Sequence, residues 1–173
     1  MRKPTILVTG TPGTGKSKLS KALPLQHLEL SKIIQDHSLF DEKDLERDAF
    51  ILDEDLVLDY LETLDLQGTV IDSHVCDFFP PEWFDLIVVL SADTHILYDR
   101  LVERKYPLSK VQENVQCEIM MEVKMDAMDA FQDHVEIMEL SSNSDQDFKQ
   151  NCEKLNSWIQ DFITQHNDSP LQD

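Results

Sequence analysis

The eight residues from Gly10 to Ser17 constrain the fold of this chain more than any other part of its sequence. They read Gly-Thr-Pro-Gly-Thr-Gly-Lys-Ser and match the pattern Gly-x-x-x-x-Gly-Lys-Ser/Thr without a gap. The apolar run 5–9 precedes them and predicts a buried strand, and a helix to about Leu23 is expected to follow. A strand, this loop and a helix are the setting in which the pattern binds phosphate. The sequence therefore predicts a site for a nucleoside triphosphate.

The composition of this loop explains why it suits an anion. Three of the four glycines of the chain lie in it. Without side chains in the way, backbone N–H groups turn inward, and the N-terminus of the following helix adds partial positive charge. We expect Lys16 to reach the β- and γ-phosphates and the Ser17 hydroxyl to hold Mg²⁺. The loop leaves the acceptor of the phosphoryl group open between water, a nucleotide and another small molecule.

The rest of the chain alternates between short apolar runs and helical patterns. Further strands are expected at 26–30, 69–72, 85–90 and 136–140. Helices are expected at 31–34, from Asp53 past Leu64, at 93–104, at 109–132 and from about 148 onward. This alternation predicts an α/β protein whose parallel sheet is covered on both faces. The charged stretch 41–48 is expected to be an exposed loop, and the absence of linkers and repeats favours one domain over 1–173.

Composition narrows the classes of partner. The net charge of −19 argues against direct binding to DNA or another nucleic-acid backbone, because phosphates need lysine and arginine. A basic protein partner suits the charge, which also fits the simpler role of keeping the protein soluble. No apolar run approaches the roughly 18 residues of a membrane helix. The three cysteines are far apart and lack metal-ligand spacing, which favours a reducing, intracellular compartment.

A second strand of a phosphate-loop protein is expected to end in an acid that orders the Mg²⁺ shell. Asp72 fits best, because it ends the apolar run 69–72. Asp85 begins its strand and Asp53 begins a helix, so both fit less well.

His74 follows just past the end of the same strand, where open α/β sheets place their chemistry. A histidine there could position or deprotonate an attacking water, or it could be a structural hydrogen-bond partner. A zinc site built from Asp72, His74, Cys76 and Asp77 is the weakest interpretation, since no matching second pair of ligands occurs elsewhere.

These motifs together resemble the adenylate kinase isoenzyme 6 family, small nuclear and cytoplasmic ATPases that assist maturation of the small ribosomal subunit. The matching segments are Gly10–Ser17, Ile51–Asp55, Val70–Pro80, Leu97–Leu101 with Arg104, and Asn114–Ile119. The segment Asp-x-His-x-x-Asp-x-Phe-Pro is much more specific than the phosphate loop. Lys105 stands where the family usually has glycine, and Pro107 is unexpected, so both changes put the shape of the lid in question.

The resemblance implies an adenylate-kinase-like three-layer fold with a five-stranded parallel sheet. It also implies a monophosphate-binding segment at about 33–53 and a short lid at about 103–113. It places the loop 142–144 beside the adenine. The implied nucleotide-binding residues are Gly13, Thr14, Gly15, Lys16, Ser17, Lys18, Arg100, Arg104, Asn143 and Ser144. Arg100 could instead lie on a helix surface and pair with Asp99 or Glu103.

The resemblance further implies the activity. It implies a nucleoside monophosphate kinase that converts ATP and AMP to two ADP, with ATPase activity and a role in 18S rRNA maturation. The cofactors would be ATP and Mg²⁺, and the partner a basic ribosomal protein of the small subunit. The implied catalytic residues are Lys16, Asp72, His74 and Arg104, with Ser17 and Asp72 at the metal. An ATP-driven switch protein and another small-molecule kinase remain the alternatives.

The arginines suggest a slow kinase. The chain has only four, namely Arg2, Arg47, Arg100 and Arg104. One arginine that stabilises the transferring phosphoryl group is worth about 10³–10⁵ in rate. Because only Arg100 and Arg104 lie near the expected lid, with Arg47 in the monophosphate segment, we expect slow transfer in which hydrolysis matters as much.

Overall fold

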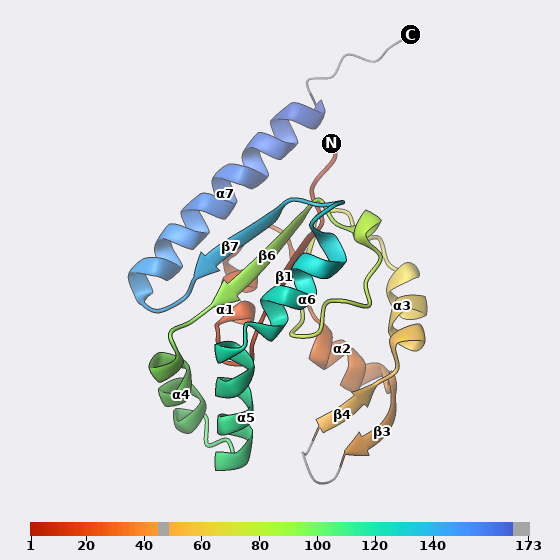
Figure 1. Cartoon of the computed structure of the whole chain (residues 1–173). Helices are drawn as coiled ribbons and strands as arrows, with labels where there is room; N and C mark the ends of the chain where they lie inside the picture. Colours follow the sequence, from red (N-terminus) through yellow and green to blue (C-terminus); the bar gives the residue numbers. More distant parts are fainter. Residues whose placement is uncertain (45–48, 168–173) are drawn as a thin grey trace.

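The computed structural model describes residues 1–44 and 49–167. A five-stranded parallel sheet forms its centre, with the strand order β2-β5-β1-β6-β7 (Figure 1). The strands are β1 (Ile6–Gly10), β2 (Gln26–Glu29), β5 (Thr69–Asp72), β6 (Leu86–Ser91) and β7 (Ile137–Ser141). β1 pairs with both β5 and β6, so the strand that leads into the phosphate loop lies in the middle of the sheet.

Seven α-helices lie within the described residues. They are α1 (Lys16–Ala22), α2 (Leu30–His37), α3 (Glu54–Glu62), α4 (Thr94–Glu103), α5 (Leu108–Ile119), α6 (Glu122–Phe131) and α7 (Asp145–Asn167), and a short 3₁₀ turn covers Pro81–Trp83. The expected cap at Asp53 is confirmed, because its side chain accepts a hydrogen bond from the Leu56 N–H at 3.0 Å. None of the described helices has the length and apolar character needed to cross a membrane.

The two faces of the sheet bury separate cores, because side chains alternate along each strand. Leu7 and Ile71 face the core that α3 and α6 complete. Ile6 and Val8 face the opposite core, which α1 and α7 complete. Figure 1 shows α6 crossing one face of the sheet and the long α7 running beside β7. The three-layer arrangement and the five-stranded parallel sheet are therefore confirmed.

The expected exposed loop at 41–48 is wrong for the part that the structure describes. β3 (Phe40–Asp44) and β4 (Ala49–Leu52) pair as an antiparallel ribbon, and residues 45–48 lie outside the described residues. A charged composition says little about backbone pairing, since the ladder is made by N–H and C=O groups. The expected helix at 31–34 is also longer than predicted, because α2 spans Leu30–His37.

The expected long helix at 109–132 is two helices. α5 ends at Ile119, and α6 begins at Glu122 after Met121 takes the left-handed conformation at φ 54°. Because methionine favours helices and no glycine or proline marks the break, no local pattern predicts it. α5 begins after its N-cap Pro107, whose carbonyl accepts hydrogen bonds from the N–H groups of Lys110 and Val111. The chain turns here because α5 packs on α4 whereas α6 packs on the sheet.

Two residues of α6 allow a matched test of this arrangement. Phe131 is fully buried and meets the Phe84 ring edge to face, with centroids 6.1 Å apart, whereas Met125 is 58% exposed. We expect Phe131→Ala to lower the free energy of unfolding by about 3–5 kcal/mol. Met125→Ala should change it by less than about 0.5 kcal/mol. Urea unfolding followed by circular dichroism measures both, and equal losses would contradict the packing described for α6.

Candidate active site

The phosphate loop depends on glycine for its backbone and for its packing. Gly13 and Gly15 have φ of 95° and 91°, a region that other residues rarely adopt. A Cβ atom at Gly13 would lie 2.8 Å from Leu97 Cδ1 and 3.0 Å from Leu101 Cδ2. Thr14 closes the loop, since its hydroxyl donates to the Thr11 carbonyl at 2.7 Å. The loop is thus held from within and by α4, and its glycines leave the inner backbone uncovered.

Lys16 is folded over the same loop. Its ammonium donates to the carbonyl of Gly10 at 2.8 Å and to that of Thr11 at 3.4 Å. Burial lowers the pKa of Lys16 to about 8; Asp72 and Glu118 oppose that shift, and Arg104 adds to it. A pKa near 8 leaves most of the lysine charged at neutral pH, so it remains suited to phosphate oxygens.

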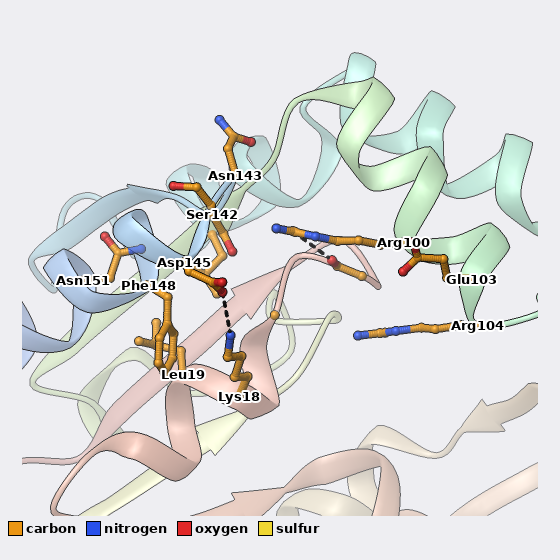
Figure 2. Close-up of a pocket in the computed structure, with 14 residues that line it drawn as sticks. Lys18, Leu19, Arg100, Glu103, Arg104, Ser142, Asn143, Asp145, Phe148 and Asn151 are labelled. Atoms are coloured by element: carbon orange, nitrogen blue, oxygen red, sulfur yellow. Dashed lines mark hydrogen bonds and ion pairs between the residues drawn. The ribbon is translucent and has the colours of Figure 1, made fainter.

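A pocket of about 680 Å³ opens beside the loop (Figure 2). It is lined by Gly13, Gly15, Lys18, Leu19, Leu90, Arg100, Glu103, Arg104, Ser142, Asn143, Ser144, Asp145, Phe148 and Asn151. Seven of the ten residues expected to bind nucleotide line this pocket. The other three, Thr14, Lys16 and Ser17, do not line it. Thr14 is buried within the loop, and Lys16 and Ser17 are the first two residues of α1. The structure therefore gathers residues from four separate parts of the chain around one space.

Two arginines enter the pocket from α4. Arg100 donates to the Gly13 carbonyl at 3.3 Å, and Arg104 follows one helical turn later (Figure 2). The contact with Gly13 decides against the alternative in which Arg100 pairs with Asp99 or Glu103. Arg47, which was expected in the monophosphate segment, lies outside the described residues.

The loop after β7 forms the opposite wall of the pocket. The Asn143 side-chain oxygen accepts from the Asp93 N–H at 2.7 Å, and the Asn143 N–H donates to Asp147 at 2.8 Å. Asn143 is therefore fixed in this wall through both its side chain and its backbone. Ser144 lies beside it and accepts from the Asp147 N–H at 3.1 Å.

Asp145, Phe148 and Asn151 line the pocket but were not predicted from the sequence. Asp145 pairs with Lys18 at 3.5 Å, and the Lys18 ammonium also lies 4.3 Å from the centre of the Phe148 ring. Asn151 donates to the Ser141 carbonyl at 2.8 Å and ties α7 to this wall. Phe148 belongs to an apolar stripe of α7, and that periodicity reports burial but not which end of the helix lines a pocket.

Asp72 ends β5 next to the phosphate loop. It is 5% exposed and stands beside Val8 of β1 in the sheet register. Its carboxylate contacts the Nε2 atom of His27 at 2.5 Å, a partner that the sequence did not suggest. The competing acids have other contacts: Asp85 pairs with Arg2 at 2.6 Å, and Asp53 caps α3. Asp72 is therefore the acid at the correct end of the sheet.

His74 lies two residues past the end of β5 and is exposed. Partial removal from water and the nearby charges of Lys16 and Lys110 lower the pKa of His74 to about 4. Its imidazole is consequently neutral near pH 7 and has a nitrogen free to accept a proton. Lys110, on α5, is a further cation at the site that the sequence did not single out.

The oxygen donors at this site suit Mg²⁺. Mg²⁺ keeps several waters and takes one or two protein oxygens together with phosphate oxygens. Asp72 supplies a carboxylate, and Ser17 begins a helix that packs against β5. In the part of the chain that the structure describes, no three His, Cys, Asp or Glu residues gather in a way that could hold a metal alone, which argues against the zinc interpretation.

Glu118 connects α5 to the phosphate loop. One carboxylate oxygen accepts from the Thr11 hydroxyl at 2.6 Å, and the other accepts from the Ala92 N–H at 3.0 Å. The residue lies in the matching segment Asn114–Ile119, but its role could not be read from spacing. It fixes the base of α5 against the phosphate loop.

The comparisons with known proteins fit this arrangement. Residues 6–121 match the family described as AAA domain. The chain is 38% identical over 170 residues to "Adenylate kinase isoenzyme 6 homolog" of Dictyostelium discoideum, covering 95% of this chain and 97% of that protein. It is likewise 38% identical over 172 residues to the homolog of the same name in Caenorhabditis elegans, covering 95% and 94%.

This chain belongs to the adenylate kinase isoenzyme 6 family. It is accordingly a member of a nucleotide kinase and ATPase family, with a phosphate-loop kinase fold that implies nucleotide binding. A shikimate kinase from Bacteroides thetaiotaomicron is similar in fold, with a TM-score of 0.59 and 17% identity over 90% of this chain and 97% of that one. At that identity the likeness shows the fold alone.

Lys105 and Pro107 are accommodated in the turn between α4 and α5. Lys105 follows α4 in the left-handed conformation at φ 59°. Its N–H bonds to the Val102 carbonyl at 2.9 Å, and the Tyr106 N–H bonds to the Leu101 carbonyl at 3.2 Å. This pair of bonds is the Schellman helix ending, which favours glycine. Lysine thus keeps the geometry of the turn at some cost in stability, and Pro107 begins α5.

We expect Lys105→Gly to raise the free energy of unfolding by about 1 kcal/mol, because it removes the steric cost of a left-handed residue. Lys105→Ala serves as the matched control, since it removes the same charge and keeps Cβ. Chemical denaturation of both variants measures the difference. Equal stabilities of the glycine and alanine variants would contradict strain at this turn.

Proposed function

We propose that this protein transfers the γ-phosphoryl group of ATP to AMP or a related nucleoside monophosphate, forming two ADP, and also hydrolyses ATP. The pocket that joins the phosphate loop to Arg100 and Arg104 carries this proposal. Membership in the adenylate kinase isoenzyme 6 family supports it.

Each charged residue has a role in that reaction. Lys16 would leave the carbonyls of its own loop and bind the β- and γ-phosphates, while Arg104 and Arg100 neutralise charge from the side of α4. Ser17 and Asp72 would hold Mg²⁺, which supplies positive charge to the phosphate oxygens when bound. The wall at Asn143 and Ser144 would hold the adenine.

Hydrolysis needs a group that orders water, and His74 suits that role. Its lowered pKa keeps it neutral, and its place past the end of β5 puts it at the carboxyl edge of the sheet. A neutral imidazole can orient an attacking water and accept its proton. Among the arginines that the structure describes, Arg100 and Arg104 line the pocket and Arg2 does not, so we expect phosphoryl transfer to be slow, with hydrolysis of comparable importance.

The biological setting is a proposal that rests on family resemblance. We propose that the protein acts in the nucleus and cytoplasm in maturation of the small ribosomal subunit and its 18S rRNA. A basic small-subunit ribosomal protein would be its partner. The net charge of −19 supports a basic partner, because opposite charges accelerate encounter.

Production of ADP from ATP tests the activity. We expect AMP to accelerate it, with a second ADP formed per turnover, and dAMP and CMP to report the breadth of the acceptor site. Lys16→Ala is the control and should neither bind nor turn over ATP. If no monophosphate changes the rate while a basic ribosomal protein with RNA stimulates hydrolysis, the protein is an ATP-driven switch and not a kinase.

His74→Gly separates hydrolysis from binding. We expect ATP hydrolysis to fall by about 10²-fold, the lower end for loss of a general base, with little change in the KM for ATP. His134→Gly is a matched control, because His134 is exposed in the turn after α6. Unchanged hydrolysis in the His74 variant would make that residue structural.

A further inference from the structure

One hydrogen bond links Asp72 to the edge strand of the sheet. The His27 Nε2 atom lies 2.5 Å from Asp72 Oδ2. Both side chains are largely withdrawn from solvent, with 14% of the His27 side chain and 6% of the Asp72 side chain exposed. The acid proposed to hold the metal therefore has a fixed protein neighbour, supplied by a strand outside every motif recognised in the sequence.

The register of the sheet creates this contact. β2 pairs with β5 in parallel, and His27 stands beside Val70. Residues paired in register point to the same face, and Val70 and Asp72 share a face because they are two residues apart. That face is the one α1 covers, since Val70 packs in the same core as Leu19. His27 and Asp72 thus meet on the side of the sheet where the phosphate-binding helix begins.

The chemistry of the two side chains determines which atom donates the hydrogen bond and which accepts it. A carboxylate accepts hydrogen bonds only, so the Nε2 atom of His27 carries the hydrogen and donates it. Oδ2 of Asp72 is occupied by this bond. The bond involves Oδ2 and leaves the geometry of Oδ1 fixed beside it. One oxygen is held and the other is left to face a ligand.

The bond between His27 and Asp72 is important because Lys16 lies nearby. Asp72 attracts the Lys16 ammonium strongly enough to oppose the fall in the lysine pKa, yet Lys16 donates to Gly10 and Thr11. A carboxylate free to rotate would turn toward that cation, and both groups would be lost to a nucleotide. The bond from His27 holds Asp72 away from such a pairing.

We propose that His27 is a positioning residue that orients the Asp72 carboxylate toward the Mg²⁺ of the bound nucleotide. This inference rests on the proposed function, because it requires a nucleotide–metal complex at the phosphate loop. Partners that orient a metal-binding side chain in this way typically change metal affinity or activity by about 10- to 100-fold when replaced.

Two amide variants test the geometry. The nitrogen of a glutamine side chain can take the place of His Nε2, whereas that of asparagine takes the place of Nδ1 and falls short of Asp72. Both variants are neutral, polar and similar in their effect on the strand. Leu28→Ala is the structural control, because Leu28 lies on the same strand and packs in the opposite core.

The main measurement is Mn²⁺ binding, followed by electron paramagnetic resonance, to the protein saturated with a non-hydrolysable ATP analogue. We expect His27→Asn to weaken Mn²⁺ binding by about 10- to 100-fold and His27→Gln to restore most of it. Leu28→Ala should lower thermal stability and leave Mn²⁺ binding unchanged. Affinity for the analogue in EDTA should be the same in the parent and both His27 variants.

The outcomes separate this inference from the proposed function. If the parent binds the analogue but His27→Asn holds Mn²⁺ as tightly as the parent, the inference fails alone. Equal weakening in His27→Gln and His27→Asn would also overturn it, because the donor position would then be irrelevant. Failure of the parent to bind the analogue would refute the proposed function, and the inference with it.

Discussion

The pairing of β1 with β5 is the constraint on which the rest of the site depends. The register sets Val8 beside Asp72, so the acid lies level with the end of the strand that leads into the phosphate loop. Because side chains alternate along a strand, a slip of one residue would carry Asp72 to the other face of the sheet and away from α1. Apolar residues on both faces of β1 and β5 prevent that slip, since each face has a core to fill.

The electrostatics of the site follow from this placement. Lys16 lies among two acids and an arginine, and its charge survives burial because Asp72 and Glu118 offset the loss of water. Glu118 also bonds to the loop and to the residue just past the end of β6, so it balances charge and joins α5 to the sheet. Without a ligand, Lys16 and Arg100 donate to carbonyls of the phosphate loop, so both cations already lie where phosphate would bind.

Much of the fold could be predicted from the sequence, because short local patterns of residues determine it. The glycine spacing of the phosphate loop, the apolar strands and the cap at Asp53 each depend on residues close together in the chain. The β3–β4 ribbon and the break at Met121 could not be predicted, because backbone pairing and the packing of α5 and α6 against different neighbours decide them. Methionine is compatible with either a continuous or a broken helix, and charged residues with either a loop or a strand.

The residues of the site likewise divide into those that the sequence predicted and those that it did not. The loop lysine, Asp72 and the arginines Arg100 and Arg104 stand in recognisable motifs, and the structure brings them to the same end of the sheet. His27 and Phe148 reach the site only through strand register and helix placement. Their neighbours in the sequence carry no signal for that, since a histidine on a short strand and a phenylalanine on an apolar stripe are ordinary residues of a core. Thr14 shows the reverse, because its motif position suggested a ligand contact and its hydroxyl closes the loop instead.

The strand order also determines when the site comes into being. The phosphate loop is made early in synthesis, but the acid beside it lies some sixty residues later, and the wall at Asn143 about seventy residues beyond that. Each of these contacts crosses a long stretch of chain, which makes the parallel sheet slow to assemble. A chain that emerges from its N-terminus therefore carries the phosphate loop long before it has a complete pocket. The pocket can be complete only once residues 142–151, the last of its lining residues in the chain, have been made.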